Sequence, residues 1–301
     1  MDRTILYIIN PISGRGNKKE IKEIIEEETK KTGLRFFVFP SVIDGDYSAL
    51  FPMVQDEKIT DVVIAGGDGT INQVVDAFKH LDVNFGIIPC GSGNGLAFSA
   101  GISKNIKKAL HTIFAGTSKW TDSFLINDHF ACMLCGVGFD AQVAHDFGKA
   151  PRRGLATYIQ KTISNFIIAK TYPFTLITKQ KEIVTNAFFI SIANSNQFGN
   201  HFTIAPKASL TDGLLDVIIL TKQNKLSVLL QVIKQISGYN KVKSIEMINE
   251  NASLIYFQTN ELKILNHLGA PVHIDGDPAE TMMEIKIKTI TNCFRLIYPS
   301  Y

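Results

Sequence analysis

Features that mark specialised classes of protein are scarce in this sequence of 301 residues. It has four cysteines, too few for a disulfide scaffold, and its 31 basic and 28 acidic residues leave a net charge of only +3. Nucleic-acid-binding domains usually carry a larger basic excess, so we expect no nucleic-acid partner. No run approaches the roughly 18 apolar residues of a membrane span. The apolar run at residues 5–9 is too short for a signal peptide, so we expect a cytoplasmic protein without a transmembrane segment.

The sequence has ample material for a folded core. Hydrophobic residues make up 45% and charged residues 20%, which excludes disorder for most of the chain. Cys132 and Cys135 form a Cys-x-x-Cys pair inside an apolar run, and no second Cys or His pair lies at metal-binding spacing. We therefore expect buried small side chains there rather than a zinc or redox site.

The first part of the chain alternates between strand and helix patterns. Apolar runs at residues 5–9, 34–39, 61–65 and 85–88 predict buried strands. Apolar residues at helical spacing predict helices at residues 18–31, 71–78 and 106–113. This alternation predicts a doubly wound α/β domain over residues 1–120.

Strand patterns dominate the rest of the chain. Short β-rich runs lie at residues 123–126, 130–135, 174–178, 183–192, 215–220, 252–257, 272–275 and 283–287, with helical patterns at 154–170 and 225–237. We predict an antiparallel β-sandwich domain over residues 121–292. The last run, residues 293–298, either closes this domain or pairs with the first, in which case residues 293–301 complete the first domain. Exposed edge strands of such a sandwich are compatible with a homodimer.

Glycine-rich loops follow three of the predicted parallel strands. They read Asn-Pro-Ile-Ser-Gly-Arg-Gly at 10–16, Gly-Gly-Asp-Gly-Thr at 66–70 and Pro-Cys-Gly-Ser-Gly-Asn-Gly at 89–95. Ligands of open α/β sheets bind where the carboxyl ends of the strands meet. Glycine lets the backbone approach a phosphate and point N–H groups at it. One such loop could be a simple turn, but three at successive strand ends indicate a phosphate site.

An acidic residue in the second loop restricts which phosphate-containing ligands this site could bind. Asp68 would repel a phosphate unless a metal or a transferred proton intervenes, so we expect a nucleotide with Mg²⁺. The sequence lacks Gly-x-Gly-x-x-Gly after the first strand, which argues against NAD, and it lacks a Walker P-loop. The residues themselves leave the acceptor of any phosphoryl transfer open.

These three loops resemble the nucleotide motifs of the diacylglycerol kinase catalytic-domain family, which includes bacterial lipid kinases, sphingosine kinases and ceramide kinases. The resemblance continues in Ala-Pro-Lys-Ala-Ser-Leu-Thr-Asp-Gly-Leu-Leu-Asp at 205–216, which is similar to a bacterial motif of the family. It ends in Val-His-Ile-Asp-Gly-Asp at 272–277, where the family carries Asp-Gly-Glu. The motifs span nearly the whole chain in the family's order.

The resemblance implies a set of functional residues. Those expected to contact ATP are Asn10, Pro11, Ile12, Ser13, Gly14, Ser41, Gly66, Gly67, Asp68, Gly69, Thr70, Ile71, Asn72 and Ser92. A structural Mg²⁺ would be held by Ser209, Asp212 and Leu214, with Ser209 and Leu214 binding through backbone oxygen. Asp277 would be the general base. Asp68 would belong to the acidic network around the catalytic Mg²⁺, and the sphingosine kinase branch credits the residue at this position with catalysis.

This sequence departs from the family pattern at three acidic positions. Asp277 stands in place of Glu, so either the backbone approaches closer or Asp275 shares the task. Gln73 replaces a usual Glu and Gly95 a usual Asp, and the third loop is closer to the sphingosine kinase version.

Two further acids are candidates for the acceptor site. Asp122 lies where the bacterial branch has an acid important for activity, and Asp140 where the sphingosine kinase branch keeps an acid for the lipid head group. Each could instead be a turn residue.

The resemblance implies an ATP- and Mg²⁺-dependent lipid kinase that acts on a primary hydroxyl, with diacylglycerol or a sphingoid base as leading acceptors. The apolar face of the helix predicted at 154–170, beside the basic loop at 148–153, would suit peripheral binding at the inner membrane surface. Two alternatives remain. An NAD kinase shares Gly-Gly-Asp-Gly-Thr, and a regulator could have kept the fold and lost activity.

Overall fold

The computed structural model of the chain describes residues 3–12, 18–139, 141–142, 169–197, 205–221, 242–249 and 252–300. The helix predicted at 154–170 falls almost entirely outside these residues, and the one at 225–237 lies wholly outside them. The chain divides into two compact units, the first made of Met1–Thr121 and Asn292–Tyr301 and the second of Asp122–Thr291. No helix among the described residues is long and apolar enough to cross a membrane.

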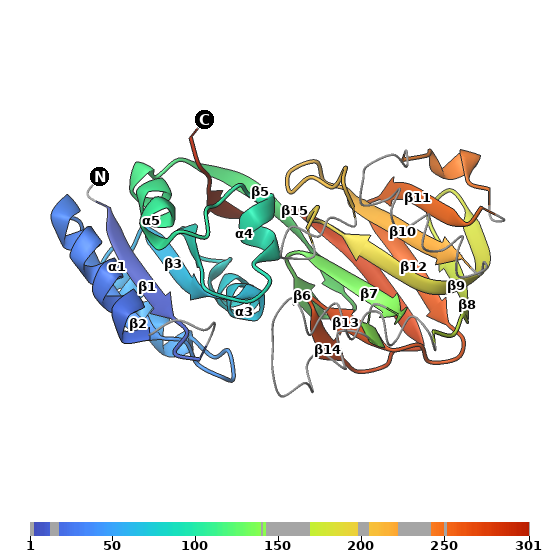
Figure 1. Cartoon of the computed structure of the whole chain (residues 1–301), viewed down its shortest axis with the longest axis horizontal. Helices are drawn as coiled ribbons and strands as arrows, with labels where there is room; N and C mark the ends of the chain where they lie inside the picture. The colour runs from blue at the N-terminus through green and yellow to red at the C-terminus, as the bar shows by residue number, and fades with distance from the viewer. Residues whose placement is uncertain are drawn as a thin grey trace. The chain divides into compact units, whose positions relative to one another are not determined.

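The first unit is built on a parallel sheet (Figure 1). Its strands are β1 (Thr4–Ile9), β2 (Arg35–Pro40), β3 (Asp61–Gly66), β4 (Asn84–Pro89) and the end of β15 (Glu284–Ile297), in the order β15-β4-β3-β1-β2. Every residue of β1 and β3 is buried, so both faces of the sheet are covered. Parallel pairing of β15 with β4, Arg295 opposite Asn84 and Leu296 opposite Phe85, shows that the last run of the chain joins this sheet.

The helices of the first unit connect these strands. They are α1 (Lys18–Thr32), α2 (Phe51–Asp56) with the short η1 (Ser48–Leu50) before it, α3 (Asp68–Phe78), α4 (Gly95–Ser99) and α5 (Ile106–Ala115). Helix α1 is followed by Gly33, whose φ of +72° is a left-handed conformation that glycine adopts readily. In α3 the apolar residues at helical spacing are buried against the sheet, as the pattern predicts.

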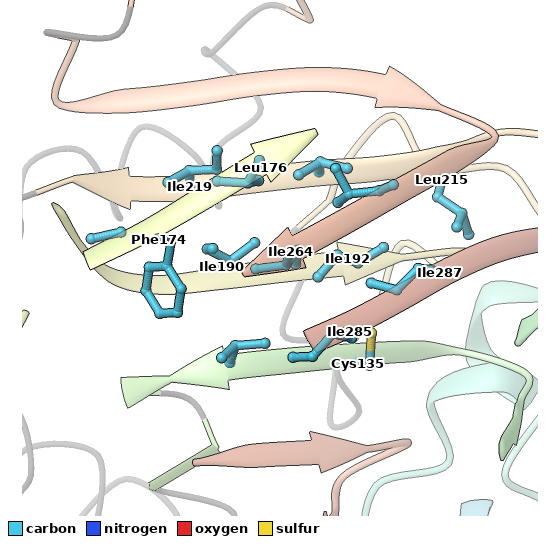
Figure 2. Close-up of a cluster of buried hydrophobic side chains, with 14 of the residues drawn as sticks. Cys135, Phe174, Leu176, Ile190, Ile192, Leu215, Ile219, Ile264, Ile285 and Ile287 are labelled. Atoms are coloured by element: carbon cyan, nitrogen blue, oxygen red, sulfur yellow. The ribbon is translucent and has the colours of Figure 1, made fainter. Parts of the chain in front are cut away.

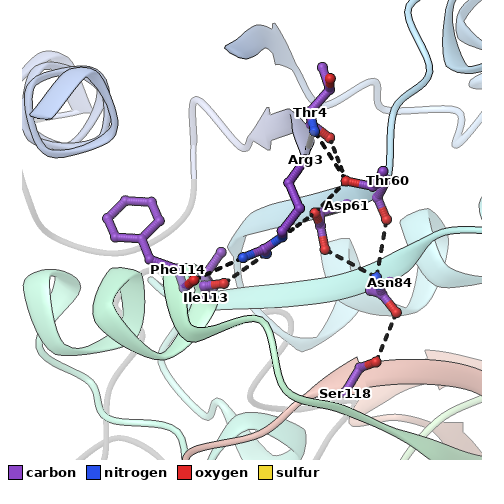
Figure 3. A network of polar contacts seen from close by, with 8 residues as sticks. All are labelled: Arg3, Thr4, Thr60, Asp61, Asn84, Ile113, Phe114 and Ser118. Atoms are coloured by element: carbon purple, nitrogen blue, oxygen red, sulfur yellow. Dashed lines mark hydrogen bonds and ion pairs between the residues drawn. The ribbon is translucent and has the colours of Figure 1, made fainter. Parts of the chain in front are cut away.

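A polar network ties the amino ends of the central strands together (Figure 3). The carboxylate of Asp61, fully buried at the start of β3, accepts hydrogen bonds from Arg3 Nε at 3.0 Å and Asn84 Nδ2 at 3.2 Å. The Arg3 guanidinium also donates to the carbonyl oxygens of Ile113 at 2.8 Å and Phe114 at 2.9 Å in the last turn of α5. This network stabilises the end of the sheet away from the glycine-rich loops.

The second unit is an antiparallel sandwich. Its strands are β5 (Ser118–Ile126, which starts in the first unit), β6 (His129–Ala131), β7 (Leu134–Gly138), β8 (Tyr172–Ile177), β9 (Glu182–Ala193), β10 (Leu215–Thr221), β11 (Leu254–Thr259), β12 (Glu261–Asn266), β13 (Val272–Ile274), β14 (Asp277–Ala279) and β15, with the short helix η2 (Ile245–Met247) before β11. Strand β9 changes partners along its length. Its first half pairs with β8, and its second half lies between β7 and β10.

The core of this unit consists of aliphatic and aromatic side chains (Figure 2). They come from the inward faces of its strands, with Cys135 among them, and include Phe174, Leu176, Ile190, Ile192, Leu215, Ile219, Ile264, Ile285 and Ile287. Cys132 and Cys135 are both buried free thiols, as the sequence predicted. The fold class predicted from the sequence, an α/β domain followed by a β-sandwich, is confirmed.

Several predicted boundaries were wrong. The strand expected at 130–135 is two strands, β6 and β7, because the backbone N–H groups of residues 132–134 bind the Asp275 carboxylate instead of a neighbouring strand. The strand expected at 272–275 ends at Ile274, and Asp275 lies in a turn. The runs at 283–287 and 293–298 belong to the single strand β15. Helices α2 and α4 and strands β12 and β14 were not predicted.

Candidate functional site

The three glycine-rich loops follow β1, β3 and β4, which are neighbours in the sheet. Backbone hydrogen bonds join the loops at the carboxyl ends of these strands. The N–H of Asn10 donates to the Ala65 carbonyl at 2.9 Å, and the N–H of Cys90 donates to the Gly66 carbonyl at 2.8 Å. The described residues at the start of each loop therefore lie next to one another at the edge where an open α/β sheet binds its ligands.

A side-chain contact joins the first loop to the second. The Asn10 amide donates from Nδ2 to Thr70 Oγ1 at 2.6 Å and accepts the Ile12 N–H at 2.8 Å through Oδ1. Glycine at position 66 allows the close approach of Thr70, because a Cβ there would lie 2.8 Å from the Thr70 Cβ. Asn10 thus fixes the start of the first loop on the first turn of α3.

The second and third loops touch through two glycines. A Cβ on Gly91 would lie 2.5 Å from the Gly67 Cα, so the third loop has no room for a side chain at position 91. The buried Asn94 amide holds the third loop in shape, because Oδ1 accepts the Gly91 N–H at 2.8 Å and Nδ2 donates to the Gly91 carbonyl at 2.9 Å. Asn94 has a φ of +59°, which Asn tolerates better than most residues. The motif at 89–95 contains Asn94, but the sequence alone does not indicate this role.

Further residues predicted to contact the nucleotide lie around this junction. Asp68 is the first residue of α3, where the positive end of the helix dipole favours a negative charge. Ser41 follows β2 and donates its N–H to the Ile9 carbonyl at 2.9 Å, and Ser92 is exposed in the third loop. The Ile71 side chain is buried in the core of the unit, so only its backbone could take part in binding.

The other candidates in these loops differ in exposure. Pro11 and Ile12 are exposed, Gly69 and Asn72 are half-buried in α3, and Ser13 and Gly14 lie outside the described residues.

In the second unit, both the backbone and the side chain of Asp122 form hydrogen bonds with the loop before β10. Its backbone N–H donates to the Leu210 carbonyl, and its Oδ2 accepts the Gly213 N–H, both at 2.7 Å. The side chain is almost completely buried. The residues predicted to hold Mg²⁺, Ser209, Asp212 and Leu214, lie in this same loop. The structure therefore brings Asp122 to the predicted metal loop.

The carboxylates of Asp122, Asp212 and Asp216 lie near one another at this loop, and their negative charges repel. Burial, with a contribution from the nearby Asp122 charge, raises the pKa of Asp212 above its usual value. Asp212 Oδ1 accepts the Leu214 N–H at 3.0 Å. Burial also raises the pKa of Asp216 to about 6, although the Tyr256 hydroxyl and Gln258 Nε2 donate hydrogen bonds to its carboxylate. A cation would relieve the repulsion between these acids.

The described residues contain no group of three or more His, Cys, Asp or Glu side chains that could hold a metal ion. A cation at this loop would therefore depend on backbone oxygens as well as on Asp212. Oxygen ligands of this kind suit Mg²⁺, so the donor set fits the expected ion.

The two candidate bases occupy different environments. Strands β13 and β14 form a hairpin whose two turn residues, Asp275 and Gly276, both have positive φ, at +49° and +86°. Asp275 is buried, and its carboxylate accepts the N–H groups of Cys132 at 2.8 Å and of Met133 and Leu134 at 2.9 Å. Asp277, at the start of β14, is exposed. An Asp-Gly pair is a strong hairpin signal that the sequence interpretation overlooked.

The last candidate for the acceptor site, Asp140, lies outside the described residues.

Comparison with known proteins fits both halves of this architecture. Residues 4–126 match the model of the diacylglycerol kinase catalytic domain. Residues 134–289 match the model of the YegS C-terminal NAD kinase beta sandwich-like domain. The first match covers the α/β unit and the second covers most of the β-sandwich, in the same order along the chain. The chain therefore belongs to the diacylglycerol kinase catalytic-domain family and carries a YegS-type C-terminal domain.

Curated relatives agree with this assignment, and a solved structure shares the fold. The chain is 25% identical over 276 residues to a diacylglycerol kinase of Bacillus subtilis, covering 90% of this chain and 88% of that protein. It is 24% identical over 250 residues to a probable YegS-like lipid kinase of Shewanella frigidimarina, covering 81% and 78%. The crystal structure of a putative diacylglycerol kinase from Bacillus anthracis superposes with a TM-score of 0.79 at 19% identity, covering 99% and 97%. This last likeness concerns the fold.

Proposed function

We propose that the protein is an ATP- and Mg²⁺-dependent kinase that phosphorylates the primary hydroxyl of a lipid such as diacylglycerol or a sphingoid base. The observation that carries the proposal is the junction of three glycine-rich loops at the carboxyl ends of β1, β3 and β4. Backbone N–H groups without side chains in the way suit the phosphates of a nucleotide. Membership of the family indicates that the acceptor of the phosphoryl group is a lipid.

The loop junction would bind ATP through its backbone. Asn10 and Thr70 hold the first two loops in register, and the Gly67–Gly91 contact does the same for the second and third. Asp68 would take part in holding the catalytic Mg²⁺, which would neutralise the charge that develops on the phosphates. In the second unit, Asp212 with the backbone oxygens of Ser209 and Leu214 would hold a structural Mg²⁺.

Asp277 is the proposed general base. In the reaction the acceptor oxygen forms a bond to the γ-phosphorus, the bond from that phosphorus to the bridging oxygen breaks, and ADP leaves. The proton of the acceptor hydroxyl passes to the base. Asp277 is exposed, whereas three backbone N–H groups occupy the two oxygens of Asp275. This difference supports Asp277 over Asp275.

The activity is tested by incubating the protein with γ-labelled ATP and Mg²⁺ and, separately, with diacylglycerol, sphingosine and ceramide in mixed micelles, and with NAD. We expect label on at least one of the lipids. Label on NAD alone would contradict the proposal and favour the NAD kinase alternative. No label on any acceptor would favour a regulator that has lost activity.

Substitution of the two hairpin acids tests the assignment of the base. Asp277→Asn keeps the size of the side chain and the turn, so ATP binding should persist while kcat falls by about 10²–10⁴-fold, the usual contribution of general acid–base catalysis. Asp277→Glu restores the family residue, and because the position is exposed we expect it to fold and to keep activity. If Asp277→Asn leaves kcat unchanged and Asp275→Asn abolishes activity without unfolding the protein, the base is Asp275.

Asp68→Asn tests the acidic network around the catalytic Mg²⁺. The fold should survive, because the loop geometry depends on glycines 66, 67 and 91. Turnover should fall by orders of magnitude. A turnover within about threefold of wild type, less than about 1 kcal/mol of activation free energy, would show that Asp68 takes no part in the metal chemistry.

A further inference from the structure

A buried asparagine at the end of β9 joins separate segments of the second unit. Asn194 is completely buried, and its Nδ2 donates to the carbonyl oxygens of Asp122 at 2.8 Å and Cys132 at 3.0 Å. Its backbone N–H donates to the Met133 carbonyl at 2.8 Å. Exchange of the amide nitrogen and oxygen would set an acceptor against two carbonyl oxygens, so these contacts fix the orientation of the side chain.

On one side, Asn194 is linked to the hairpin that carries Asp277. The carbonyl groups of Cys132 and Met133 accept from Asn194, and the N–H groups of the same two residues donate to the Asp275 carboxylate. The segment is therefore held from both sides. Any displacement of it would move the turn that precedes Asp277.

On the other side, Asn194 is linked to the loop at residues 209–214. Asp122, whose carbonyl accepts from Asn194, donates its N–H to Leu210 and accepts the Gly213 N–H. The Asn194 side-chain amide is thus connected to the loop of the proposed metal ligands through Asp122, and to the hairpin of the proposed base through Cys132.

We propose that Asn194 is a positioning residue that couples these two elements, so that the loop and the hairpin keep one relative geometry. The functional meaning of the two elements rests on the proposed function, but the coupling itself can be measured without substrate. Sequence alone could not have pointed to this residue, because its partners lie 72 and 62 residues away along the chain.

The chain offers a matched control for this test. Asn266 is also completely buried, and its Nδ2 also donates to two backbone carbonyl oxygens, those of Ala270 and Met282, both at 2.9 Å. An Asn→Asp change at either position turns an acceptor oxygen toward two carbonyls, so both variants should lose stability for the same reason. Of the two, only Asn194 contacts Asp122 and residues 132–133, which in turn contact the loop and Asp275. The acceptors of Asn266 lie on either side of the β13–β14 hairpin and have no contact with the loop among the hydrogen bonds of the described residues.

Hydrogen exchange with site resolution is the decisive measurement. In Asn194→Asp we expect the amides of Gly213 and of Cys132–Leu134 to exchange at least about tenfold faster than in wild type, because local opening exposes both elements together. In Asn266→Asp these amides should keep wild-type rates, while the Ala270 amide exchanges faster. If Asn194→Asp does not fold, Asn194→Ala removes the same donors without adding charge. Wild-type exchange at Gly213 in a folded Asn194 variant would overturn the proposal.

A kinetic measurement distinguishes positioning from simple stability. Misplacement of a catalytic group by a distant change can cost about 10²-fold in rate, so Asn194→Asp should lower kcat by that order and leave the KM for ATP unchanged. Asn266→Asp should retain the wild-type kcat. Equal kcat losses in the two variants would overturn the proposal. If wild-type protein labels no lipid, the proposed function fails, and the exchange result still decides whether Asn194 couples the two elements.

Discussion

Replacement of Arg3 by Met tests how the first unit holds a buried charge (Figure 3). The Asp61 carboxylate is completely buried and accepts hydrogen bonds from Arg3, from Thr60 Oγ1 at 2.6 Å and from Asn84. Arg3 is its only ion-pair partner among the described residues. Arg3→Met keeps an apolar stem in place and leaves the charge on Asp61 without a cation.

The expected cost follows from the asymmetry of buried ion pairs. Removal of one partner from such a pair typically costs about 3–5 kcal/mol, because the other charge stays buried. The Arg3 side chain is 24% exposed, so water can replace part of its role, and we expect a value near the lower end, about 3 kcal/mol. Asp61→Asn should cost less, about 1–2 kcal/mol, because Arg3 keeps its two carbonyl partners in α5. The double variant should cost less than the sum of the two changes.

The assay uses the single tryptophan of the chain. Trp120 belongs to the first unit, and the Arg295 guanidinium lies 5.5 Å from its ring centroid, so its fluorescence should change when that unit unfolds. Urea titrations of the wild type, both single variants and the double variant give the four free energies of unfolding. The reasoning is refuted if Arg3→Met costs no more than Asp61→Asn.

Two further predictions concern the first unit. Gly91→Ala places a Cβ 2.5 Å from the Gly67 Cα, so the second and third loops should separate and the KM for ATP should rise; steady-state kinetics with a wild-type KM would contradict this. Burial raises the pKa of Tyr7 from 10.0 to about 12, so the stability that its neutral hydroxyl contributes is complete below pH 10 and is lost as the pH rises toward 12. Tyr7→Phe should therefore remove part of the alkaline loss of stability in denaturation curves, and an unchanged pH dependence would contradict the assignment.

Local patterns in the sequence were sufficient for the architecture of the first unit. Buried parallel strands need continuous apolar runs, and helices need apolar residues every three or four positions, so β1, β3, β4 and α3 could be recognised within short windows. The three glycine-rich loops could also be recognised within short windows, because each follows directly on a strand. Motif resemblance then indicated the family.

The tertiary structure alone separated the roles of residues that look alike in the sequence. Asp275 and Asp277 are two positions apart, yet one is buried against backbone N–H groups 141 to 143 residues away and the other is exposed. The same holds for Asn194, one asparagine in a polar run of the sequence, whose amide turns out to lie between two distant segments. Hydrogen bonds of this range depend on which strands become neighbours. Local sequence patterns determined most of the strands and longer helices and their order, and the packing of the sandwich decided which polar groups meet.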